Sequence, residues 1–141
     1  MTVRARHFLL LWFCCFPFAI HAETEWVLAG GKNDNTYRIY IGSNIKRLPN
    51  GLVEGREIWD YREPQTDNAL KITYRSRMWL QSFNCKERSA AALSLAFYSD
   101  GMGKGTMVHS MKRSQDKIKY LRPAPGSPGE YMVNKVCSWV K

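Results

Sequence analysis

The sequence predicts an α+β domain: a single antiparallel sheet of about six strands, with one C-terminal helix tied to the sheet by a disulfide. Three observations predict this class. Short runs rich in Val, Ile, Thr, Tyr and Trp, separated by turn residues, fill most of the chain. The segment 127–140 changes to the spacing of an amphipathic helix. Two cysteines remain once an N-terminal leader is removed, and cysteines of exported proteins pair.

Residues 1–22 have the order of a cleavable signal peptide. A short positive start is followed by the uncharged run 8–20, and Ala22 supplies a small residue at the cut. A membrane-spanning helix needs about 20 apolar residues, whereas this run has 13 and contains Pro17. The signal peptide is therefore favoured over an uncleaved anchor, and residues 23–141 are expected to form the mature domain. No later stretch is apolar enough to span a membrane, so no transmembrane segment is expected after cleavage.

Cleavage of the leader limits the chemistry that the mature chain retains. The mature chain keeps 19 basic and 12 acidic residues, which give a formal net charge of +7, and it keeps Cys85, Cys137 and His109. Two cysteines in an exported chain most simply form one disulfide, the alternative being two separate buried thiols. A structural zinc site needs about four Cys or His ligands, and no nucleophile elbow or triad spacing accompanies the single histidine. We therefore expect no enzyme activity, no catalytic residue, no bound metal and no cofactor.

The first strands follow from alternating side chains between turn signals. The sequence predicts strands at 26–29, 37–41 and 52–62, and a polar loop at 63–68 that contains Pro64.

The clearest alternation begins at residue 71. Arg75 and Arg77 point to one face and Tyr74 and Met78 to the other, which predicts one wet and one buried face. Two further strands are expected at 91–97 and 104–112, joined by a hairpin turn at 100–103, and a short edge strand at 118–121.

The C-terminal segment has the start signal of a helix. Ser127 stands at the cap, Pro128 follows in the first turn, and Glu130 stands three residues after the cap. Val133, Val136, Cys137 and Val140 then fall on one helical face, so a disulfide from Cys137 would pin the helix to the sheet near the end of the fourth strand.

Several short motifs along the mature chain, in this order, resemble the bacterial surface-adhesin protein E family. The resemblance implies an antiparallel sheet with a C-terminal helix tied on by a disulfide. It also implies an exported protein of a Gram-negative bacterium, because the named member of the family is an outer-surface adhesin that binds host matrix and plasma proteins. The matching motifs are Trp26, Tyr37-Arg38-Ile39-Tyr40-Ile41 followed by Ser43-Asn44-Ile45, Trp59-Asp60-Tyr61, Asn84-Cys85-Lys86-Glu87-Arg88, Leu95 with Tyr98-Ser99, Met102-Gly103-Lys104-Gly105, Pro125-Gly126-Ser127 and Val136-Cys137.

Basic and aromatic side chains supply the candidate binding surface. Such a surface attracts polyanionic envelope or host ligands and acidic proteins; the alternative is a solvated face that keeps the protein soluble. For Trp79, packing in the core or in a homodimer is the alternative to ligand binding. Export argues against a nucleic-acid partner. The candidate residues are Arg75, Arg77, Trp79, Lys112, Arg113, Lys117 and Lys119.

Two functional hypotheses follow, and a hydrolase is disfavoured by the missing catalytic set. The first is an exported, non-enzymatic, adhesin-like binding module that contacts host or envelope macromolecules through a basic sheet surface. The alternative is a structural or accessory protein of the periplasm or envelope that acts by protein–protein contact. The two differ in location, at the outer cell surface or in the periplasm.

Overall fold

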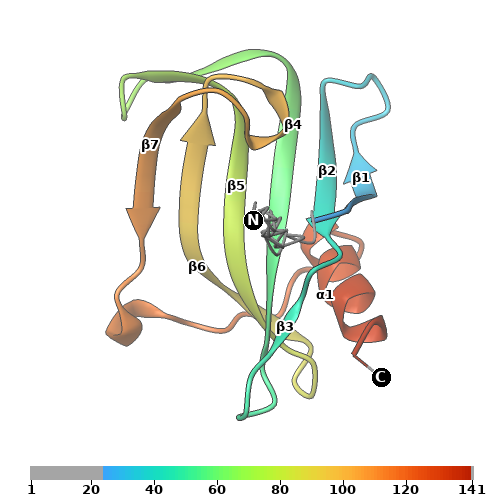
Figure 1. Cartoon of the computed structure of the whole chain (residues 1–141). Coiled ribbons are helices and arrows are strands. Elements are labelled where there is room, and N and C mark those ends of the chain that lie inside the picture. The colour runs from blue at the N-terminus through green and yellow to red at the C-terminus, as the bar shows by residue number, and fades with distance from the viewer. Residues whose placement is uncertain (1–23, 141) are drawn as a thin grey trace, which may run out of the picture.

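The computed structural model describes residues 24–140 and consists of one antiparallel sheet and one C-terminal helix (Figure 1). The predicted signal peptide lies outside the described residues. The sheet order is β1-β2-β4-β5-β6-β7, with β3 paired to β4, so the strand order follows the chain. The α+β class predicted from the sequence is confirmed. The elements are β1 (Trp26–Gly31), β2 (Tyr37–Gly42), β3 (Lys46–Arg47), β4 (Val53–Asp67), β5 (Ile72–Asn84), β6 (Ser89–Tyr98), the 3₁₀ turn η1 (Gly101–Gly103), β7 (Met107–Lys112), the 3₁₀ turn η2 (Gln115–Lys117) and α1 (Pro128–Ser138).

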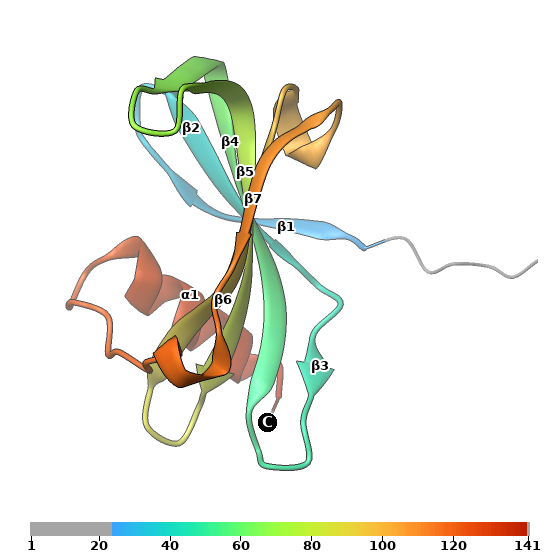
Figure 2. The same cartoon turned by 90° about the vertical axis from the view of Figure 1, so that its left-hand side faces the viewer.

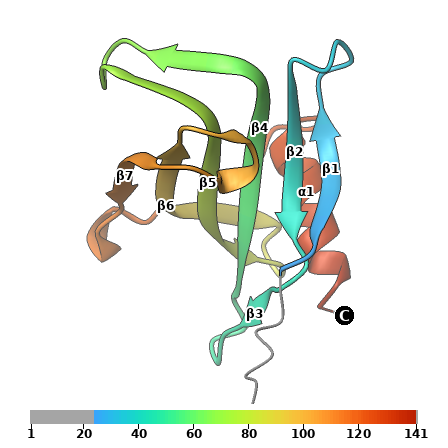
Figure 3. The same cartoon turned by 45° about the horizontal axis from the view of Figure 1, so that its top comes forward.

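The two faces of the sheet are covered by different elements. Figure 2 shows α1 and the curled tip of the β4–β5 hairpin on one side, and the β6–β7 connection with η1 on the other. We call these the helix side and the loop side. Figure 3 shows the β4–β5 hairpin bending over the sheet, so the helix side is concave.

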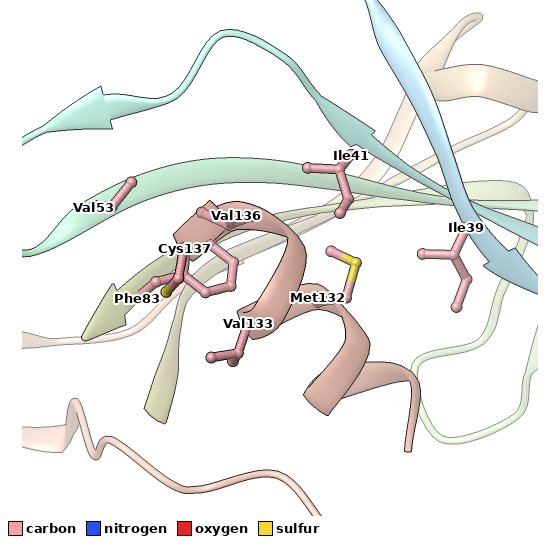
Figure 4. Close-up of a cluster of buried hydrophobic side chains, with 8 residues drawn as sticks. All are labelled: Ile39, Ile41, Val53, Phe83, Met132, Val133, Val136 and Cys137. Carbon is pink, nitrogen blue, oxygen red and sulfur yellow. The ribbon is translucent and has the colours of Figure 1, made fainter. Parts of the chain in front are cut away.

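The helix forms for the local reasons that its sequence predicts. The Ser127 side chain accepts a hydrogen bond from the Glu130 backbone N–H at 3.2 Å. In return, the Glu130 carboxylate accepts from the Gly126 N–H at 2.7 Å, so otherwise unpaired groups at the helix start are satisfied. The apolar face of the helix then closes the core of the protein (Figure 4), which comprises Ile39, Ile41, Val53, Phe83, Met132, Val133, Val136 and Cys137.

The disulfide joins this helix to the sheet. Cys85 follows the end of β5 and bonds Cys137 on the buried face of α1, with a Cα–Cα distance of 5.4 Å. The predicted pairing is confirmed. The bond lies beside Phe83, which is 1% exposed, so it reinforces the best-packed part of the core.

A polar network fixes the β6–β7 connection on the loop side. The fully buried Ser76 hydroxyl donates to the Asp100 carbonyl at 2.6 Å and accepts from the Gly103 N–H at 2.8 Å. Asp60 accepts from the Met102 N–H at 2.8 Å. These bonds hold η1 against β4 and β5, and they satisfy backbone groups that burial would otherwise leave unpaired.

Two sequence expectations about the central strands are wrong. Residues 63–67 belong to β4, because the pairing with β5 shifts register between Asp60 and Gln65 and so accommodates Pro64. The face of Arg77 is also not the wet face of the sheet. Phe83 has the same parity in β5 and packs under α1, so Arg77 lies half-buried on the helix side.

The outer connections also differ slightly from expectation. The predicted edge strand at 118–121 is reduced to a single bridge between Ala90 and Leu121. The strand predicted at 104–112 begins only at Met107, because residues 104–106 complete the turn that η1 starts. Neither change alters the strand order.

Candidate functional site

A groove of about 370 Å³ runs over β5, β6 and β7 beside η2. Its apolar wall includes Trp79, Leu95 and Met111, and cationic side chains border it at Arg113 and Lys117. We call it the basic groove. No carboxylate is among its lining residues in the part of the chain that the structure describes, although the exposed Asp116 lies on η2 next to Lys117. The groove therefore combines an apolar wall with a cationic border, and within residues 24–140 no carboxylate lines it.

The fold brings together four of the seven predicted surface residues. They lie on β5, at the end of β7, directly after β7 and on η2, and all line the basic groove: Trp79, Lys112, Arg113 and Lys117. Arg75 and Lys119 do not line it. Arg75 is exposed near the hairpin tip, where its Nε donates to the Tyr61 carbonyl at 3.3 Å, and Lys119 is exposed on the segment that leads to α1.

Arg77, the remaining predicted residue, is held in an aromatic stack. Its guanidinium carbon lies 4.5 Å from the ring centre of Trp59, 5.7 Å from Tyr61 and 5.9 Å from Trp79. Tyr37 stacks on Trp59, with ring centres 5.0 Å apart. Such cation–π contacts stabilise a partly buried arginine, so the pairing of Arg75 with Arg77 on one strand does not produce an open cationic patch.

Glu57 is a buried carboxylate next to this stack. It is 5% exposed and accepts hydrogen bonds from the Trp59 indole and the Gln81 amide. Burial raises the pKa of Glu57, while the Trp59 and Gln81 hydrogen bonds and the charge of Arg77 act in the opposite direction. A second groove of about 270 Å³, between these side chains and the start of α1, meets the basic groove at Trp79.

Sequence reasoning missed Glu57 as a member of the site. Glu57 pairs with Trp79, and Trp59 pairs with Arg77, across β4 and β5. One signal was present in the sequence: Glu57 and Trp59 alternate with the buried Ile58 in a strand, so both point to the same face. That alternation does not reveal which side α1 covers, and this decides whether Glu57 is buried.

The single histidine of the described residues, His109, lines neither of these grooves. His109 is half-buried on β7, with its ring centre 6.0 Å from that of Phe97. Within residues 24–140, no three His, Cys, Asp or Glu side chains gather in a way that could hold a metal ion. Among the same residues, no helix is both long and apolar enough to cross a membrane.

The fold is similar to that of solved structures of one bacterial protein. Protein E of Haemophilus influenzae, in its crystal form II, matches with a TM-score of 0.57 and 16% identity, over 83% of this chain and 99% of that one. A second structure of H. influenzae protein E gives a TM-score of 0.55 and 15% identity, over 82% of this chain and 93% of that one. At such low identity these matches show the fold. No curated protein matches the chain significantly.

A family model connects this fold to the sequence. The model described as surface-adhesin protein E matches residues 26–138, which run from the first residue of β1 to the last residue of α1. The match includes both cysteines of the disulfide and every strand of the sheet. The chain belongs to the surface-adhesin protein E family.

Proposed function

We propose that this protein is an exported, non-enzymatic, adhesin-like binding module that contacts host or envelope macromolecules through the basic groove. The observation that carries the proposal is the convergence of Trp79, Met111, Arg113 and Lys117 on one groove that no carboxylate of the described residues lines. Aromatic and cationic side chains that share a concave surface are typical of macromolecular recognition. Family membership supports an adhesin-like protein, and the predicted signal peptide supports its export.

The basic groove is suited to anionic partners. Arg113 and Lys117 are exposed, so their charges are available to a partner and are screened by salt. Positive charge that is focused in a groove raises the local concentration of an anionic ligand and speeds its encounter.

Binding of the mature chain, residues 23–141, to immobilised polyglutamate and to heparin tests this surface. The double variant Arg113→Gln/Lys117→Gln should weaken binding about tenfold, because two exposed ion pairs are lost. The variant Lys46→Gln/Arg47→Gln removes the same charges from the exposed strand β3 and should bind as the wild type does. If both variants lose affinity equally, net charge alone explains the binding and the groove is not the site.

Location separates the adhesin from the accessory protein. Antibody labelling and protease treatment of intact cells should reach the domain if it acts as an adhesin at the outer surface. A domain that is protected in intact cells and released with the periplasmic fraction would instead support the accessory role.

A further inference from the structure

The basic groove lies beside a strand edge that can accept a partner. β7 is the last strand in the sheet order, so within residues 24–140 its outer side pairs with no other strand. The other edge strand, β1, carries no charged residue. Natural sheets often protect an open edge with charged residues, and the same row of main-chain groups is a template for an added strand.

The register of β7 identifies which main-chain groups face outward. The Arg113 N–H donates to the Leu93 carbonyl at 2.8 Å, and Met111 pairs with Leu95 in the same register. In an antiparallel ladder, alternate residues direct their N–H and C=O groups to the neighbouring strand. The N–H and C=O groups of Ser110 and Lys112 therefore point away from β6, toward solvent.

The side chains around this edge select the occupant. Met111, which lines the basic groove, is 45% exposed and gives a docked strand an apolar contact. Arg113 and Lys117 border the same groove, and Lys112, the last residue of β7, adds a third cation to its lining. A second copy of this chain, paired edge to edge, would bring the same cations together at the seam. An acidic strand would neutralise them.

We propose that the outer edge of β7 binds an extended acidic peptide segment of another protein as an added strand. The main chain of this segment pairs with Ser110 and Lys112. Its carboxylates reach Arg113 and Lys117, and an apolar side chain covers Met111. Main-chain pairing supplies affinity in such strand addition, and the alternating side chains supply specificity. The inference rests on the proposed function and names the class of its partner.

The test uses the mature chain and the acetylated, amidated octapeptide Glu-Thr-Val-Thr-Glu-Thr-Glu-Thr, which presents Glu and Val on the same face of a strand, as Met111 and Arg113 require. Binding should slow the hydrogen exchange of the Ser110 and Lys112 amides and leave that of Met111 unchanged, because the latter already bonds to β6. N-methylation of alternate peptide amides removes the main-chain donors without changing charge, and it should weaken binding at least about tenfold. The protein itself is unaltered in this comparison, so a folding defect cannot explain the loss.

Two protein variants complete the test. Ser110→Pro removes one outward N–H and should lower the affinity for the peptide without changing the affinity for heparin. An edge strand tolerates proline where its N–H faces solvent. Arg113→Gln/Lys117→Gln should weaken both ligands, with Lys46→Gln/Arg47→Gln as the control of equal charge. If Ser110→Pro unfolds the domain, the binding of the N-methylated peptide to the wild-type domain still tests strand addition.

Three results would overturn the inference, and they separate it from the proposed function. Strand addition is rejected if the N-methylated peptide binds as tightly as the unmodified one, or if heparin binds more tightly than the peptide without protecting the Ser110 and Lys112 amides. Either result still leaves an anionic partner for the groove. Self-association that protects Ser110 and Lys112 without peptide assigns the edge to a second copy. Failure of every anionic probe to bind rejects the basic groove as a site, and with it the proposed function.

Discussion

Breaking the bond between Cys85 and Cys137 should lower the free energy of unfolding by about 4 kcal/mol. The two residues are 52 positions apart in the sequence. In the chain-entropy account, a closed loop of that length restricts the unfolded chain by about 14 cal/mol/K, which gives this figure at room temperature. Because Cys137 is 3% exposed in the core, the folded structure around it is expected to persist after reduction.

Urea unfolding of the oxidised and the reduced domain measures this difference. The variant Cys85→Ala/Cys137→Ala should match the reduced protein to within the cost of the small cavity left at Cys137. The m-value should rise on reduction, because the uncrosslinked chain exposes more surface when it unfolds. As a control, Val133→Ala trims the same helix face and should lower stability without raising the m-value. A loss below about 1 kcal/mol together with an unchanged m-value would refute the reasoning.

Three further predictions concern stability. Ser76→Ala leaves the Asp100 carbonyl and the Gly103 N–H without their buried partner, and should cost about 1–3 kcal/mol in urea unfolding; an unchanged midpoint would show that η1 is held by other contacts. Because burial raises the pKa of Glu57, the folded state binds this proton more tightly than the unfolded chain does. Acidification from neutral pH toward the unfolded pKa should therefore add stability that Glu57→Gln does not gain, and parallel pH profiles would contradict this. Ser127→Ala should cost about 1 kcal/mol by removing the helix cap; Ser138→Ala, which removes only the exposed bond from the Ser138 hydroxyl to the Lys135 carbonyl, is the comparison and should cost less.

Local features of the sequence predicted most of the fold. The cap at Ser127, the spacing of Val133, Val136 and Cys137, and the alternation in β5 each depend on neighbours within a few residues. The structure has each of these elements where the sequence placed them. The disulfide could also be predicted, because a mature chain with two cysteines has only one intramolecular pair to form.

The features of the fold that the sequence did not predict depend on contacts between strands. Alternation shows that Arg77 and Met78 face opposite ways, but not which face the helix covers, so Arg77 was expected on the wet side. The cation–π stack with Trp59 exists only because β4 and β5 pair in one register. The loop predicted around Pro64 is wrong for a similar reason, since the register shift that accommodates this proline is a property of the pair of strands.

The candidate site was predictable only in part. Lys112, Arg113 and Lys117 are close in sequence, so their clustering required only that β7 and η2 adjoin. Trp79 lies on β5, two strands away from β7 in the sheet, so its position in the same groove could not be derived from the local sequence pattern. Arg75 and Lys119 do not line the groove, because the predicted surface rested on their charge and charge alone does not place a residue in a groove.

Because α1 follows every described strand in the sequence, its position sets the order in which the core can assemble. Because the strand order follows the chain, the sheet pairings join consecutive or nearly consecutive strands and can form early; these pairings are β1·β2, β2·β4, β4·β5, β5·β6 and β6·β7. The core cannot close until the last segment arrives, since Met132, Val133 and Val136 supply its lid. Until then Ile39, Ile41 and Phe83, each 1% exposed in the finished domain, face solvent. Deletion of α1 would therefore leave the apolar side of the sheet exposed and prone to aggregation, even if every strand forms.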